Sequence, residues 1–326
     1  MIRLLRVILL LLIGIALAVI LFKLRTPEST PQTRSEALGE LNDLSTPERR
    51  LLEPGEDFSP LGKPKAYEWL AIVPEPGQSW HKFAKSGFPW PESGRHTLYL
   101  QPFGEFPPDR SPPLEALRAW TEAWFMLPAK LLPPLDVTSA SLTNRINGSA
   151  TQYLTRDIVD QAVRGMPQDG YLLLVVTMHD LYPDSGWNFV FGEAHLAKRV
   201  GVFSFARYHP SFYGEKHVAN LASSGTADVT NLILRRSCAV LAHEAGHLFG
   251  MAHCIYYCCL MNGSNSLYES DSRPMHECPI CLRKLQTAIG FDGRARYRAL
   301  RELCRSYGFT KEVAWLDSRL DHIGPQ

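Results

Sequence analysis

Residues 243–253 have the sequence HEAGHLFGMAH, and this stretch decides which fold and which chemistry we expect. It closes a helix that the pattern predicts over residues 230–249. His243 and His247 are four positions apart, so they lie on one face of that helix and can bind one metal ion. Gly250 is expected to end the helix, because glycine readily adopts the left-handed turn that reverses the chain.

The reversal brings a third nitrogen ligand, His253, toward the same metal. Three protein ligands leave a fourth coordination position for water, which is the arrangement of catalytic zinc. Such zinc lowers the pKa of its water toward about 7. Glu244 is then the general base, which takes the proton of the water and passes it to the leaving amine. The motif predicts a zinc-dependent peptidase.

Three other interpretations of the motif stay open. The chain could be a non-catalytic protein that holds zinc on the same scaffold, although Glu244 favours an enzyme, because a structural site needs no base. Cys254 could replace the adjacent His253 as a ligand. The enzyme could also hydrolyse a non-peptide amide, because the motif specifies the activated water more than the bond attacked.

The cysteines point to a second metal site. The chain has seven, and five of them cluster in one short stretch: Cys254, Cys258, Cys259, Cys278 and Cys281. Two cysteine pairs at this separation favour one four-sulfur structural zinc over a pair of disulfides or a redox CxxC motif. The spacing leaves open whether Cys258 or Cys259 is the ligand. Cys238 and Cys304 are expected to be small core residues.

At this point the sequence resembles the archaemetzincins. The resemblance rests on the three-histidine motif together with the cysteines up to Cys281, and it covers about residues 65–310. It extends to MNGSN at 261–265, RP at 273–274, CPICL at 278–282, DLYP at 180–183 and WNFVFGE at 187–193.

The resemblance implies more than the spacing does. Met261 would be the Met-turn residue beneath the catalytic zinc. A second, structural zinc would bind the four cysteines Cys254, Cys259, Cys278 and Cys281, giving two zinc ions per chain. The fold would be a metzincin-like α/β (α+β) arrangement with a twisted mixed sheet, an active-site helix and a small zinc-bound C-terminal part. The activity would be hydrolysis of peptides or proteins, with an aminopeptidase-like preference as one form of it.

Hydrophobic patterns predict the remaining elements of an α/β fold. Strands are expected at 67–73, 96–101 and 171–177, of which the last is a continuous apolar run typical of a buried central strand. Residues 200–207 are expected to form either an edge strand that pairs with substrate or an ordinary inner strand. Helices are expected at 114–125 and 151–164, and residues 130–137 are expected to be extended.

The N-terminal region predicts a membrane protein. Residues 7–22 are an unbroken apolar run flanked by basic residues at both ends. A single-pass anchor within residues 1–25 is therefore expected, with a cleaved signal segment of a secreted protein, or a buried helix, as the alternatives. Residues 26–64 are proline-rich and are expected to be a flexible linker before a peptidase domain at 65–326. Within this linker, residues 35–44 could form a short helix.

Charge and composition exclude little beyond one class of partner. The formal net charge is +1, and no run of Lys and Arg is visible. We therefore expect a peptide or protein substrate and a membrane as partners, and no nucleic acid.

Overall fold

The computed structural model describes residues 33–135, 142–213 and 226–324. Residues Arg34–Gln326 form one compact unit. Its main sheet has five strands in the order β2-β1-β5-β8-β7. Neighbouring strands pair in parallel, except that β7 is antiparallel to β8. In chain order the strands are β1 (Thr97–Phe103), β2 (Ala129–Leu131), β5 (Gly170–Thr177), β7 (Gly192–His195) and β8 (Val200–Ser204).

The middle strand, β5, is buried along its whole length. Alternate side chains point to opposite faces of a strand. Leu172 and Leu174 therefore belong to one hydrophobic core, and Leu173 and Val175 belong to the other. The prediction of a buried central strand at 171–177 is confirmed by this burial. The prediction rested on the fact that a strand covered on both faces is apolar at nearly every position.

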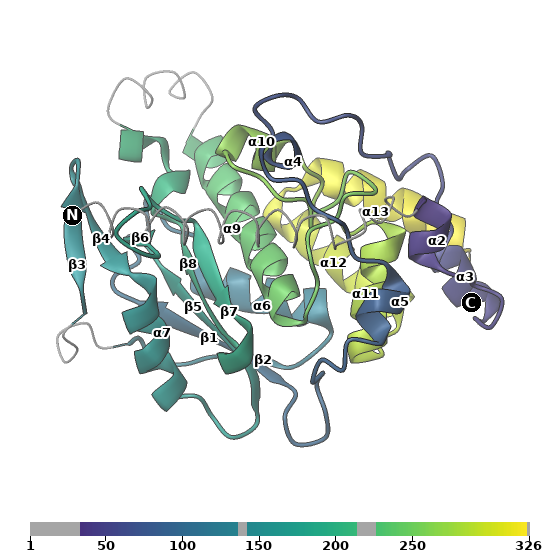
Figure 1. The fold of residues 1–326 in the computed structure, drawn as a ribbon, viewed down its shortest axis with the longest axis horizontal. Helices are drawn as coiled ribbons and strands as arrows, with labels where there is room; N and C mark the ends of the chain where they lie inside the picture. The colour runs from purple at the N-terminus through teal and green to yellow at the C-terminus, as the bar shows by residue number, and fades with distance from the viewer. Residues whose placement is uncertain (1–32, 136–141, 214–225, 325–326) are drawn as a thin grey trace, which may run out of the picture. The chain divides into compact units, whose positions relative to one another are not determined.

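Helices cover both faces of this sheet (Figure 1). On one face lie α6 (Leu114–Phe125) and α9 (Thr226–Leu248), and on the other lies α7 (Thr155–Arg164). The helix expected at 114–125 matches α6, and the long helix expected from residue 230 begins at Thr226. The fold is therefore mixed α/β, as expected.

A second sheet has three strands in the order β3-β4-β6. It consists of the hairpin β3 (Asn144–Asn147) and β4 (Ala150–Leu154), with β6 (Asp180–Tyr182) parallel to β4. The helix expected at 151–164 therefore begins only at Thr155, because the first residues of that range pair with β3 and β6. Short 3-10 turns follow β7 and β8, at Leu196–Lys198, Ala206–Tyr208 and Pro210–Tyr213.

Beyond α9 lies a layer of helices from both ends of the unit (Figure 1). The C-terminal ones are α10 (Leu267–Asp271), α11 (Pro279–Ile289), α12 (Gly293–Tyr307) and α13 (Thr310–Ile323). The N-terminal ones are α2 (Arg34–Leu38), α3 (Thr46–Leu52), α4 (Trp69–Ile72) and α5 (Trp80–Ala84).

Part of the expected linker at 26–64 differs from the prediction. Helices α2 and α3 bury apolar side chains in the core, among them Leu38 and Leu52. The guanidinium of Arg283 donates to the carbonyls of Leu38 and Glu40. Buried arginine donors and apolar contacts therefore dock this segment, although its composition is that of a linker.

One further element differs from the sequence-based expectation, and the structure decides between two alternatives for another. Residues 69–72 form the single helical turn α4 in place of a strand, because the Glu269 carboxylate accepts from the Trp69 amide at 3.0 Å and Val73 N donates back to Trp69 O at 2.7 Å. The strand β8 lies between β5 and β7, so it is an inner strand, and β7 forms the edge.

The expectation of a membrane location is corrected. The apolar run at 7–22 lies outside the described residues. Within residues 33–135, 142–213 and 226–324, no helix is both long and apolar enough to cross a membrane.

Candidate functional site

The histidine motif occupies the end of α9 and the turn after it. The helix ends at Leu248, and Gly250 has a φ of 89°, in the left-handed region that glycine tolerates. Met251 N donates to Gly246 O at 3.2 Å, which closes the helix end. The chain therefore reverses where the sequence predicted.

The reversal brings the three histidines together. One ring nitrogen from each of His243, His247 and His253 lies within 4.8 Å of those of the other two. The Nε2 atoms of His243 and His247 are 3.1 Å apart. The His253 ring centroid is 5.3 Å from that of His243 and 4.8 Å from that of His247.

The other ring nitrogen of each histidine has an acceptor. Nδ1 of His243 contacts Leu260 O at 2.8 Å, and Nδ1 of His247 contacts Met251 O at 2.7 Å. Carbonyl oxygens only accept, so these Nδ1 atoms carry hydrogen and each Nε2 keeps a free lone pair. Nδ1 of His253 contacts Glu75 Oε1 at 2.7 Å. A histidine that binds a metal through one ring nitrogen usually donates a hydrogen bond from the other to a carbonyl or a carboxylate. These three histidines have such partners, so they fit a zinc ion.

Burial sets the protonation states in the site. It lowers the pKa of His247 to about 4, with a further contribution from His253. Burial, followed by the two neighbouring histidines, also holds the pKa of His243 well below its usual value. Both imidazoles are therefore neutral at pH 7, the form that binds metal. Burial raises the pKa of Glu244 to about 7, against the opposing effect of His253.

Two hollows flank the histidines, and both are lined by Gly192, Glu244 and His253. The first has a volume of about 390 Å³ and is walled mainly by aromatic and aliphatic side chains, among them Trp69, Trp187, Phe189, Phe191, Tyr208 and Leu267. The second, of about 510 Å³, is more open and lies beside Glu193 and His247. The edge strand β7 thus runs past both hollows.

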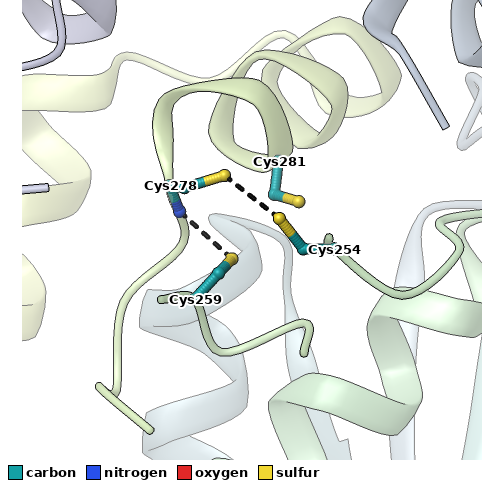
Figure 2. A group of neighbouring side chains, drawn as sticks. All are labelled: Cys254, Cys259, Cys278 and Cys281. Atoms are coloured by element: carbon teal, nitrogen blue, oxygen red, sulfur yellow. Dashed lines mark hydrogen bonds between the residues drawn. The ribbon is translucent and has the colours of Figure 1, made fainter. Parts of the chain in front are cut away.

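A second cluster consists of four cysteines (Figure 2). Cys254 and Cys259 come from the loop after His253, and Cys278 and Cys281 come from the start of α11. Their sulfur atoms all lie within 4.8 Å of one another, and those of Cys254 and Cys278 are 3.6 Å apart. A tetrahedral zinc with bonds of about 2.3 Å would separate its sulfur ligands by about 3.8 Å.

The environment of these cysteines suits a cation. All four are buried and free of disulfides. Burial raises the pKa of Cys259 and of Cys278 well above the usual thiol value, so four buried thiolates need a positive ion to compensate them. The Cys258 sulfur instead contacts Pro60 O at 3.9 Å, so the structure places Cys259 in the cluster.

One loop connects the two clusters, and Asn262 holds it in shape. Its side chain donates to Cys254 O at 2.7 Å and to Tyr257 O at 2.9 Å, and it accepts from Cys259 N at 2.8 Å. The next residue toward the N-terminus, Met261, is buried against α9, where a Cβ on Gly246 would be 2.7 Å from its Sδ atom.

Three residues of this site had no predicted role: Trp69, Glu75 and Asn262. Glu75 is 178 positions from the histidine that it contacts, and no spacing rule relates the two. An asparagine followed by glycine, as at Asn262-Gly263, predicts a turn, and that signal could have identified Asn262 as a residue that shapes the loop.

Comparisons with known proteins complete the description of the site. A family model described as Peptidase family M54 matches residues 130–287. The chain is 38% identical over 267 residues to Archaemetzincin-2 of Mus musculus, with 74% of each chain covered. It is 36% identical over 283 residues to Archaemetzincin-2 of Homo sapiens, with 79% of each covered. The crystal structure of the archaemetzincin from Methanopyrus kandleri matches with a TM-score of 0.45 and 28% identity, covering 62% of this chain and 99% of that one.

Proposed function

Because this chain belongs to the archaemetzincin family of zinc metallopeptidases, peptidase family M54, we propose that it hydrolyses peptide bonds at the three-histidine site. His243, His247 and His253 would hold the catalytic zinc, and Glu244 would be the general base. The observation that carries this proposal is the convergence of three ring nitrogens whose partner nitrogens all have acceptors.

The chemistry is divided between the metal and the chain. Zinc, when bound, supplies a Lewis acid and a water whose pKa is near 7. Glu244 accepts the proton of the attacking water and returns it to the leaving amine, which its position next to His243 and its raised pKa support. The Nδ1 contacts of the histidines keep their Nε2 atoms turned inward, so little reorganisation is needed during turnover.

A second zinc belongs to the same proposal, which makes two per chain. Cys254, Cys259, Cys278 and Cys281 offer four sulfur ligands and no open position, as structural zinc requires. Met261 would be the Met-turn residue, which its burial against Gly246 supports. On these grounds we also assign the fold to the metzincin-like class.

The substrate would lie along β7. An edge strand offers unpaired backbone groups to an extended peptide, and β7 borders both hollows. An aminopeptidase-like preference, which the resemblance implied, is part of the same proposal.

Turnover and zinc content together test the proposal in the full chain. We expect Glu244→Gln to retain zinc and to lose peptide hydrolysis by about 100-fold or more, because removal of a general base costs about 100- to 10,000-fold. His247→Ala should lose one zinc per chain together with the activity. Glu92→Gln, a change at an exposed carboxylate, is the matched control and should behave as the parent.

Full hydrolysis in Glu244→Gln would reject its role as the base. A parent chain that binds zinc at the histidines but cleaves no peptide in a diverse library would favour a zinc-binding scaffold without turnover.

A further inference from the structure

The three histidines differ in what holds them. The Nδ1 acceptors of His243 and His247 are backbone carbonyls of residues close to the motif, Leu260 and Met251. No side-chain substitution removes a carbonyl. The acceptor for His253 is the side chain of Glu75, which comes from the segment between α4 and α5. The orientation of His253 therefore depends on one replaceable group far away in the sequence.

The Glu75 carboxylate is itself fixed. Its Oε1 atom accepts from Trp69 Nε1 at 2.8 Å as well as from His253 Nδ1 at 2.7 Å. The side chains of Glu75 and His253 are only about a fifth exposed, at 20% and 21%. Burial alone disfavours a charged carboxylate, so these two donors are what makes its position favourable.

Three contacts fix the position of Trp69. Its backbone amide donates to Glu269, a carboxylate whose side chain is 1% exposed and which also pairs with Arg273 at 2.9 Å. Its ring meets the His253 ring edge-on, with centroids 5.6 Å apart. A Cβ on Gly263 would lie only 2.4 Å from Trp69 Cδ1, so the indole fills the space beside that glycine.

Gln78 fixes the far end of the same segment. Its amide nitrogen donates to Gly250 O at 3.0 Å, and its amide oxygen accepts from Ala252 N at 3.0 Å. Both partners belong to the turn that carries His253. Residues 69–78 are thus joined to this turn at Glu75 and at Gln78.

We propose that Glu75, held by Trp69, is a positioning residue that fixes the ring of His253 and thereby raises the affinity of the three-histidine site for zinc. This inference rests on the proposed zinc site. A hydrogen-bonded carboxylate fixes the tautomer and the ring orientation of a ligand histidine and increases its basicity. Glu75 adds a negative charge next to the site, which favours a divalent cation.

Metal affinity in the full chain tests the role of Glu75. The quantity is the dissociation constant of the zinc that His247→Ala removes, measured by competition with a chelator. We expect Glu75→Ala to weaken it roughly 10- to 100-fold, the usual cost of losing such a partner. Glu75→Gln keeps an acceptor oxygen without the charge, and Trp69→Phe keeps the ring without its N–H group, so each should lose less. Glu92→Gln is the exposed control.

The visible spectrum of cobalt bound in place of zinc separates positioning from general stability. We expect Glu75→Ala to change this spectrum, because its His253 ring is no longer fixed. Parent-like zinc affinity and an unchanged cobalt spectrum in Glu75→Ala would overturn the inference. If that variant does not fold, parent-like affinity and spectrum in both Glu75→Gln and Trp69→Phe would overturn it equally. A parent chain whose histidines bind no metal would instead reject the proposed function.

Discussion

At the scale of single residues, local spacing predicted the groups that converge. The spacing of His243, His247 and His253, with Gly250 between the last two, depends only on helix geometry and on one left-handed turn. Glu75 could not be predicted in this way, because its contact with His253 joins segments 178 positions apart. Such contacts are set by the packing of the whole chain.

Gly246 offers a test at this scale, because its lack of a side chain makes room for Met261. A Cβ there would lie 2.7 Å from the methionine Sδ, closer than atoms in contact can be. We expect Gly246→Ala to lower the free energy of unfolding by about 1 to 3 kcal/mol, the usual cost of overpacking. Thermal or denaturant unfolding of the apo and zinc-loaded forms measures it.

A double-mutant cycle gives the control for this prediction. If the contact with Met261 causes the loss, Gly246→Ala should cost clearly less in a Met261→Ala background. An equal cost in both backgrounds would assign the effect to something other than this contact.

At the scale of elements, the predictions succeeded where a segment carries one unambiguous pattern. The continuous apolar run of β5 is too short for a typical buried helix, and the periodicity of α6 is that of an amphipathic helix. The turn α4 carries no such pattern, because four residues are too few to distinguish a strand from a helix. Its helical turn depends on the contact with Glu269, which is far away in the sequence. For β8, the sequence left edge and inner positions open. The strand is inner because β7 pairs with the side of β8 that faces away from β5.

The start of α11 gives a test at this scale. Cys278 is its N-cap and Cys281 is in its first turn, so the proposed structural zinc ties this helix to the loop at Cys254 and Cys259. We expect Cys278→Ser/Cys281→Ser to lose one zinc per chain and to lower the melting temperature, because structural zinc contributes directly to folding. Metal analysis and thermal unfolding measure the two effects.

Cys258→Ser is the matched control, since the Cys258 sulfur contacts Pro60 O outside the cluster. It should keep both zinc ions and the parent melting temperature. Loss of a zinc from Cys258→Ser would contradict the assignment of Cys259.

At the scale of the whole molecule, composition was a poor guide to the segment that carries α2 and α3. Proline and polar residues predicted a flexible linker, yet α2 and α3 contribute Leu38, Leu51 and Leu52 to the main core. The buried Arg319 donates to Leu51 O at 2.8 Å. Composition describes a segment alone, whereas this one is ordered by what it packs against.

Removal of this segment should therefore be costly. We expect a chain that begins at residue 62 to be less stable by several kcal/mol than one that begins at residue 33, because each buried leucine contributes about 1.5 to 3 kcal/mol. The loss corresponds to a fall in melting temperature of roughly 10 °C or more. Equal melting temperatures for the two chains would mean that the docked segment contributes nothing.

The contact between Glu75 and His253 also bears on when the enzyme can become active during its synthesis. The chain leaves the ribosome with its N-terminus first, so Glu75 emerges long before the histidines. Cys281, the last cysteine of the cluster, emerges after all of them. A nascent chain that ends before residue 253 lacks a ligand, and one that ends before residue 281 lacks part of the support for the loop between the two clusters. The proposed hydrolytic centre, with its supporting loop, is therefore complete only after residue 281 has been made.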